Sequence, residues 1–144
     1  MKVVQILKSK ADEGVVTVVP GSDVGAAAKI LAERKIGTVV VSPDGEIAVG
    51  ILSERDIVRE LARVGASCLG HSVEDYMTSN LVTCTRDDSA DLVLSKMTQG
   101  RFRHMPVVDG DQLVGLITLG DVVKARLLEV SMEKEALESM IMGH

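Results

Sequence analysis

The sequence predicts a mixed α/β (α+β) protein in which one structural unit occurs twice and is followed by a C-terminal helix. The main observation is an internal repeat: Val16–Pro20 aligns with Val82–Arg86 at a shift of 66 residues, and Gly50–Val58 aligns with Gly115–Val123 at a shift of 65. Between these segments, apolar residues at i, i+3, i+4 and i+7 mark one buried helix face in both copies. Agreement in phase over a whole unit indicates a true repeat.

Each unit is predicted to run strand, helix, strand, hairpin, strand, helix. β-Branched residues favour strands, a short and wholly apolar strand is typical of one buried on both faces, and Ser-Pro-Asp-Gly is a strong hairpin signal. In order, the first unit comprises a strand over Val15–Val19, a helix over Val24–Lys35, a strand over Gly37–Val41, a hairpin at Ser42–Gly45, a strand over Ile47–Leu52 and a helix from Ser53 to about Arg63. The second unit repeats this order, with its first strand within Val82–Arg86 and its hairpin at Asp109–Asp111.

Two pieces lie outside the strict repeat. Apolar residues at positions 3, 4, 6 and 7 predict a short leading helix, and Val73, Tyr76 and Met77 mirror them ahead of the second unit. Apolar residues at helical spacing predict a long helix over Arg126–Met142, which either packs back on its own sheet or pairs with another chain. We therefore divide the chain into a first repeat with its leading helix (1–66), a second repeat (67–128) and a helical tail (129–144).

The composition argues against several classes of protein. At 144 residues and 15.3 kDa the chain can bury a real core, and its net charge of −5 argues against a protein built around nucleic-acid backbones, which requires an excess of Lys and Arg. Tyr76 and Phe102 are the only aromatic residues, so we expect a bound base to pack on aliphatic side chains rather than on aromatic rings. No apolar run reaches the roughly 18 residues that a membrane span requires, and no signal peptide is visible. We expect a cytoplasmic protein without nucleic-acid or membrane partners.

Metal and catalytic chemistry lack the residues that they need. His71 and His144 have no partners at metal-ligand spacing, and Cys68 and Cys84 suit neither a disulfide framework nor a metal site. The chain has no glycine-rich dinucleotide or phosphate loop, no nucleophile-elbow motif and no evident pair of catalytic acid and base. The sequence therefore predicts a protein that is not an enzyme, with no catalytic residues, no metal and no required cofactor.

The sharpest signal is a Gly-x-x-Ser/Thr-x-x-Asp motif that occurs at the same place in both units. One interpretation is structural, because Ser or Thr at a helix N-cap with an acid three residues later resembles a capping box. The other is a ligand site: an Asp is short for reaching back to the cap, and a carboxylate there can accept two hydrogen bonds from a vicinal diol such as that of ribose. The repetition favours the ligand site. The residues are Gly50, Ser53 and Asp56 in the first unit and Gly115, Thr118 and Asp121 in the second.

A second signal is a cluster of basic residues in the second unit only. Arg101, Arg103 and His104 precede a predicted buried strand, where charged groups either face water or meet an anion. In an acidic chain, such a local positive cluster suggests a phosphate site, although a solvated strand edge is the alternative. Since the first unit offers only Lys35 at the matching place, we expect two unequal sites, with phosphate held beside the second unit's cluster.

Taken together, these segments resemble a tandem pair of cystathionine-beta-synthase (CBS) domains, also called a Bateman module, in a small stand-alone protein of the bacterial type. The resemblance extends from about Val3 to Leu128. It implies a β-α-β-β-α fold for each repeat, with the two repeats packed pseudo-symmetrically sheet to sheet, and clefts that bind an adenosine-containing ligand such as AMP, ADP, ATP, NAD or S-adenosylmethionine. The segments that carry the resemblance are Val73–Thr78, Arg103–Val108, Gly50–Asp56 and Gly115–Asp121.

The resemblance also implies roles for individual residues. The two Asp residues, Asp56 and Asp121, match the family position that binds the ribose hydroxyls, and Ser53 and Thr118 match a position near ribose or phosphate. The base and phosphate region is implied to be lined by Thr17, Thr83, Gly37, Thr38, Val39, Arg103, His104, Met105 and Pro106, with Arg101 added from the basic cluster. Gly37 and Thr38 depart from a phosphate-binding pattern because they carry no positive charge.

Three functions follow from this reading. The first is a non-catalytic regulatory module, such as an energy sensor, that binds an adenine nucleotide and alters a homodimer shaped as a disc of four repeats, and through it an unidentified regulated protein. The alternative is a ligand-independent dimeric scaffold that uses the methionine-rich tail. The third is an enzyme, because the same pair occurs inside inosine-monophosphate dehydrogenase, but that chemistry lies on an eight-stranded barrel of about 250 residues that this chain cannot contain.

Overall fold

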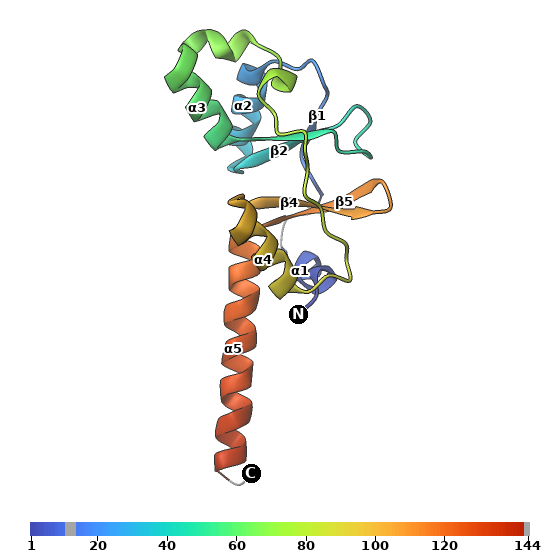
Figure 1. The fold of residues 1–144 in the computed structure, drawn as a ribbon, viewed down its shortest axis with the longest axis vertical. Helices are drawn as coiled ribbons and strands as arrows, with labels where there is room; N and C mark the ends of the chain where they lie inside the picture. The colour runs from blue at the N-terminus through green and yellow to red at the C-terminus, as the bar shows by residue number, and fades with distance from the viewer. Residues whose placement is uncertain (11–13, 143–144) are drawn as a thin grey trace.

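The computed structural model describes residues 1–10 and 14–142 and confirms the mixed α/β architecture, with two small sheets facing each other at the centre of the molecule (Figure 1). The first half comprises α1 (Val3–Ser9), β1 (Thr17–Val18), α2 (Val24–Arg34), β2 (Thr38–Val41), β3 (Gly50–Ser53) and α3 (Glu54–Val64). The second comprises two 3-10 helices, η1 (Ala66–Gly70) and η2 (Val73–Asp75), followed by α4 (Ala90–Gly100), β4 (His104–Asp109), β5 (Gln112–Thr118) and α5 (Leu119–Ile141).

The strand register shows that the repeat seen in the sequence is a repeat of structure. In the first sheet β1 runs parallel to β2, and β2 pairs antiparallel with β3 so that Thr38 lies opposite Ser53. In the second sheet β4 pairs antiparallel with β5, and His104 lies opposite Thr118. These two pairs match at the shifts of 66 and 65 found in the sequence. The prediction that β2 is buried on both faces is confirmed, since all four of its residues are buried.

The first strand of the second unit is shorter than predicted. Only Cys84 pairs in parallel with Val107, through backbone hydrogen bonds from the N–H of Cys84 to Pro106 (3.1 Å) and from the N–H of Val108 to Cys84 (2.9 Å). One residue further on, the N–H of Thr85 donates a hydrogen bond to the Asp88 carboxylate at 2.8 Å. This side-chain bond turns the backbone toward α4 and ends the ladder after one bridge.

Each core is completed by the segment that precedes the other unit. Val3 and Ile6 of α1 are buried in the core of the second unit, against residues such as Val93 and Met105. Conversely, Val73 is fully buried in the core of the first unit, with Tyr76 and Met77 packed at its margin. The mirrored apolar segments of the sequence are therefore exchanged, and in Figure 1 α1 lies with β4, β5 and α4 rather than with α2.

Backbone hydrogen bonds hold both exchanged segments in place. The N–H of Val3 donates to Asp88 at 2.9 Å in the second unit, and the N–H of Val73 donates to Ser22 at 2.8 Å in the first. These bonds satisfy backbone groups that would otherwise be buried without partners. The exchange thus combines apolar burial with backbone pairing on both sides of the molecule.

Two glycines make room for the exchanged segments. A Cβ atom on Gly50 would lie 2.3 Å from Sδ of Met77, and one on Gly115 would lie 3.0 Å from Cδ2 of Leu7. Both glycines belong to the repeated motif that ends in Asp56 and Asp121. Their conservation between the two units of this chain is therefore explained by packing against the incoming segment.

The predicted tail helix is the continuation of the last helix of the second unit. α5 runs unbroken for 23 residues, because nothing after Gly120 in this stretch is Gly or Pro. Near its middle it is anchored to the body of the molecule, where Glu129 pairs with the N-terminal amine at 2.8 Å and Arg126 pairs with Asp91 at 2.9 Å. From Val130 to Met142 every residue is exposed, and the helix projects away from both sheets (Figure 1). Of the two alternatives for the tail, packing back on its own sheet is wrong.

We predict that Gly50→Ala lowers the free energy of unfolding by about 1–2 kcal/mol, because the added methyl group overlaps the Met77 side chain in a filled core. Urea unfolding followed by circular dichroism measures this loss. Gly70→Ala is the matched control, since a Cβ there meets nothing within 4 Å. The double variant with Met77→Ala should cost less than the sum of the two single changes. Equal small effects for Gly50→Ala and Gly70→Ala would contradict the packing account.

Candidate functional site

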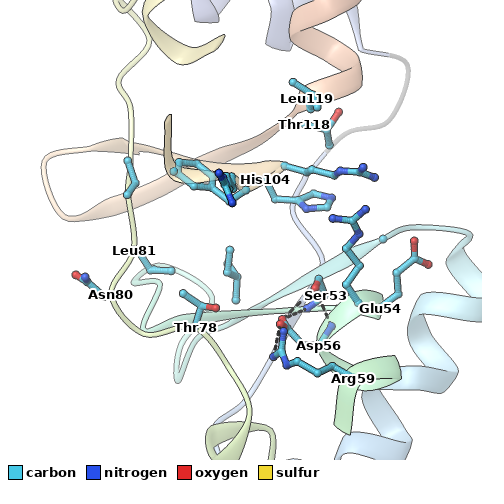
Figure 2. Close-up of a pocket in the computed structure, with 18 of the residues that line it drawn as sticks. Ser53, Glu54, Asp56, Arg59, Thr78, Asn80, Leu81, His104, Thr118 and Leu119 are labelled. Carbon is cyan, nitrogen blue, oxygen red and sulfur yellow. Dashed lines mark hydrogen bonds and ion pairs between the residues drawn. The ribbon is translucent and has the colours of Figure 1, made fainter. Parts of the chain in front are cut away.

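A cavity of about 740 Å³ opens between the two units, and residues of both units line it (Figure 2). The first unit contributes the end of β3 and the first turns of α3, from Ser53 to Arg59. The second unit contributes the segment before β4, from Gly100 to His104, and the start of α5 at Thr118–Gly120. The chain between the units, at 78–82, forms a third wall. The exchange of segments therefore creates this space, since neither unit alone has all three walls.

The Ser53–Asp56 pair at the base of the cavity forms a capping box. The hydroxyl of Ser53 accepts a hydrogen bond from the N–H of Asp56 at 3.2 Å, and Oδ2 of Asp56 accepts one from the N–H of Ser53 at 2.9 Å. Thr118 and Asp121 form the same pair at the start of α5, at 3.1 and 2.9 Å. The expectation that Asp is too short to reach back to the cap is wrong, because the extended backbone of the cap residue brings its N–H toward the carboxylate.

The Asp56 carboxylate is nearly buried and also forms an ion pair. Its Oδ1 accepts a hydrogen bond from Nη2 of Arg59, one helical turn further along α3, at 2.9 Å. Figure 2 shows this contact beside Ser53, at the lower wall of the cavity. The Arg59 side chain is 60% exposed and its Nε also lies 3.6 Å from Oε1 of Glu60, so its position depends on ion pairs rather than on packing. A ligand can draw such an arginine away at little cost.

The opposite wall carries the basic cluster of the second unit. Arg101 has a positive φ of 57°, as does Lys35 at the matching position of the first unit with 55°. This left-handed residue ends α4 and turns the chain so that Arg101, Arg103 and His104 all line the cavity. Burial lowers the pKa of His104 below its ordinary value, with Glu54 acting in the opposite direction. The imidazole is therefore neutral at pH 7.

The cavity has a positive charge in an acidic protein. Four guanidinium groups line it, against the two carboxylates of Glu54 and Asp56. Arg55, Arg101 and Arg103 form no ion pair with any residue in the described part of the chain. Arginine clusters of this kind recognise phosphate through paired hydrogen bonds. The geometry suits an anionic ligand with groups that can also bond to a carboxylate.

The structure brings together half of the residues that the sequence indicated. Seven of them line the cavity: Gly37, Ser53, Asp56, Arg101, Arg103, His104 and Thr118. The other seven do not: Thr17, Thr38, Val39, Thr83, Met105, Pro106 and Asp121. Val39 and Met105 are fully buried in the two cores, and the hydroxyl of Thr38 is buried without a hydrogen-bond partner. A role in ligand binding for these seven stays a prediction.

Several lining residues were not anticipated from the sequence. Arg55 and Arg59 flank Asp56 on α3, and their spacing of one and three residues from it was the available signal. Asn80 and its neighbours had no local signal, because only the exchange of segments brings them to the cavity. Phe102 also lines the cavity, so one aromatic ring lies at the site, and the expectation that a bound base packs on aliphatic side chains stays a prediction. A count of aromatic residues could not show that one of the two lies at the site.

The described part of the chain offers little for metal binding or for catalysis by a thiol. Residues 1–10 and 14–142 contain no group of three or more His, Cys, Asp or Glu side chains that could hold a metal ion, and His144 lies outside the described residues. Burial raises the pKa of Cys84 to about 11, so this thiol stays protonated at neutral pH and is a poor nucleophile. In the same described ranges, no helix combines the length and the apolar character needed to cross a membrane.

Comparison with known proteins identifies relatives over most of the chain. The family model of the CBS domain matches twice, at residues 7–63 and 73–128. Among curated proteins, the CBS domain-containing protein CBSX3 of Arabidopsis thaliana, described as mitochondrial, is 33% identical over 121 residues, which cover 81% of this chain and 59% of that protein. The curated CBSCBSPB2 from the same plant is 30% identical, and there the match covers only 22% of its length. This chain thus spans 59% of the length of CBSX3 and 22% of the length of CBSCBSPB2.

Solved structures show the same arrangement of two units. The crystal structure of the CBS-domain containing protein ATU1752 from Agrobacterium tumefaciens is 44% identical, with a TM-score of 0.83 over 88% of this chain and 99% of that one. The CBS domain pair of protein MJ0100, solved in complex with 5-methylthioadenosine and S-adenosyl-L-methionine, is 28% identical, with a TM-score of 0.76 over 91% of this chain and 98% of that one.

We predict that acidification from pH 7.5 to 5.5 destabilises the protein through His104. Since the pKa of this imidazole is lowered in the folded state, the unfolded chain binds more protons as the pH falls through the ordinary value of 6.5, and stability is lost in that window. The urea midpoint of the wild type should therefore fall over this range, and His104→Gln should reduce the fall. The same loss in both proteins would show that His104 is not responsible.

Proposed function

Because this chain belongs to the CBS domain family and contains a tandem pair of these domains, we propose that it is a non-catalytic regulatory module that binds an adenine nucleotide in the cavity between its units. The single observation that carries the proposal is that four arginines and the Asp56 carboxylate line one cavity, with Arg101 and Arg103 on the wall opposite Asp56. The arginines require an anionic group on the ligand, and the Asp56 carboxylate requires a hydrogen-bond donor. A nucleotide supplies both, as phosphate and as ribose hydroxyls.

Each part of a nucleotide has a matching wall in this proposal. The ribose hydroxyls bond to Asp56, which is held in place by the capping box of α3. The phosphate extends toward Arg101 and Arg103, with Arg59 free to leave Asp56 and join them. The adenine packs among apolar side chains of the third wall, such as Leu81 and Val82. The adenosine part is supported by the ligands named for the MJ0100 pair, and the preference for phosphate over sulfonium rests on the arginines of this chain.

We further propose that the module acts as a homodimer. Apolar side chains are exposed on the outer faces of both second helices of the repeat, Val58 and Val64 on α3 and Val123 and Leu127 on α5. We take these exposed apolar side chains as the candidate interface between copies. A nucleotide can alter the dimer only by its difference in affinity for two arrangements of the dimer, which is typically about 1–3 kcal/mol.

The two cysteines, Cys68 and Cys84, are free, which supports a reducing compartment such as the cytoplasm.

A dimeric scaffold is the second candidate. The observation in its favour is the exposed end of α5, where the side chains of Leu137, Met140 and Ile141 have no contact that buries them. A scaffold requires this helix and no ligand, whereas the regulatory module requires the cavity. Binding of nucleotide therefore discriminates between the two.

We predict that an adenine nucleotide raises the thermal midpoint of the wild type by several degrees, because a ligand at a hundred times its dissociation constant adds about 2.7 kcal/mol of stability. Thermal unfolding with AMP, ADP, ATP, NAD and S-adenosylmethionine measures this shift. Asp56→Ala should weaken binding by about tenfold to a hundredfold, since it removes hydrogen bonds to a charged acceptor. Asp23→Ala is the matched control, because it removes the N-cap of α2 outside the cavity. No shift with any ligand would favour the scaffold.

We also predict that Gly at two positions with positive φ, Lys35 and Arg101, has the same effect on stability at both positions but a different effect on nucleotide binding. Arg101→Gly and Lys35→Gly should both raise the free energy of unfolding by about 1 kcal/mol, because Gly adopts a positive φ without steric cost. Only Arg101→Gly should weaken AMP binding, by about tenfold, because Arg101 lines the cavity and Lys35 does not. Calorimetric titration with AMP and with adenosine measures both effects. Equal losses for AMP and adenosine would contradict a phosphate contact.

A further inference from the structure

Asp121, the second residue at which a ribose was expected to bind, already pairs with a lysine of the same chain. Nζ of Lys10 lies 2.9 Å from Oδ2 of Asp121 and donates a second hydrogen bond, 3.0 Å long, to the carbonyl of Leu116. Lys10 directly follows α1, whose apolar face is buried in the core of the second unit. The exchange of segments therefore delivers this lysine to a carboxylate 111 residues further along the chain.

The matching place in the other half of the molecule holds a neutral side chain. Leu7 and Met77 are equivalent, because each lies against the motif glycine of the opposite unit. Three residues after Met77 the chain carries Asn80, which lines the open cavity at Asp56. Three residues after Leu7 it carries Lys10. The equivalent segments thus bring a cation, Lys10, to Asp121 in one half and a neutral side chain, Asn80, to the cavity wall in the other.

The cations on the two carboxylates are also held differently. Arg59 is 60% exposed and comes from the same helix as Asp56, whereas the Lys10 side chain is only 26% exposed and comes from a distant element. Burial acts to raise the pKa of Asp121, but the bond and charge of Lys10, together with the N–H of Thr118, hold it below its ordinary value. Displacing Lys10 would leave an ammonium group half buried without its carboxylate, which is costly. Displacing Arg59 from Asp56 leaves a largely exposed side chain that still has Glu60 as a partner.

We infer that Lys10 is a built-in occupant of the Asp121 position, so that this chain binds a single nucleotide, at Asp56. The inference rests on the proposed function, since it concerns the number of nucleotides that the module takes. The ammonium and the N–H of Thr118 both bond to Oδ2 of Asp121, and the second bond of Lys10, to Leu116, anchors the cation beside the carboxylate that a vicinal diol would need. Removing the charge at residue 10 opens a second site of the same chemical class.

Calorimetric titration of the full chain with AMP and with ADP tests this inference through the number of nucleotides bound per chain. The wild type should bind one, and this binding should be weakened about tenfold to a hundredfold in Asp56→Ala and kept in Asp121→Ala. Lys10→Met, which retains the aliphatic stem, should bind two, and adding Asp121→Ala to it should return the number to one. Lys8→Met is the matched control, because Lys8 is exposed two residues away and should leave the number at one.

Three outcomes would overturn the inference. Two nucleotides on the wild type would show that Lys10 does not block the position, and one nucleotide on both the wild type and Lys10→Met would show that its charge is not the obstacle. Loss of binding in Lys10→Met would make Lys10 a ligand for phosphate instead. If Lys10→Met is unstable, Lys10→Gln removes the same charge with a polar side chain. Absence of binding to every variant and to the wild type would contradict the proposed function itself, and is thereby distinguishable from the other results.

Discussion

The exchange of the two leading segments is the contact on which the rest of the structure depends. A unit of about 60 residues is only marginally stable by itself, and here each unit lacks part of its own core. Val3 fills the second core and Val73 fills the first, both without exposed surface. Since each core requires a segment from the other half, the two units fold as one body with their sheets face to face. The cavity is a consequence of this arrangement, because the crossing chain forms one of its walls.

The site is built on groups that the fold needs for other reasons. Asp56 completes the capping box of α3, and the same carboxylate lies at the base of the cavity. Helix capping and ligand recognition are therefore not competing interpretations of the motif. The cap fixes the position of the carboxylate in advance, which lowers the ordering cost of binding.

Pseudo-symmetry of the backbone coexists with asymmetry of charge. The capping boxes, the left-handed ends of α2 and α4, and the motif glycines recur in both halves. The cations do not recur: Asp56 pairs with Arg59 of its own helix, whereas Asp121 pairs with Lys10 of a distant segment. An acidic chain with a net charge of −5 thus contains a cationic cavity, because net charge averages over surfaces that a ligand never meets.

The sequence by itself determined the elements and the chemistry that is local along the chain. Hydrophobic period, turn residues and the internal repeat identified the helices and strands, and half of the site residues predicted from the sequence now lie at the cavity, among them Asp56 and Arg101. Only the tertiary structure decided which segment completes which core, that Phe102 lines the cavity, that α5 projects into solvent and that Lys10 meets Asp121. Periodicity and capping act over a few residues and leave a trace in the local pattern, whereas these contacts join residues that only the packing of the two units brings together.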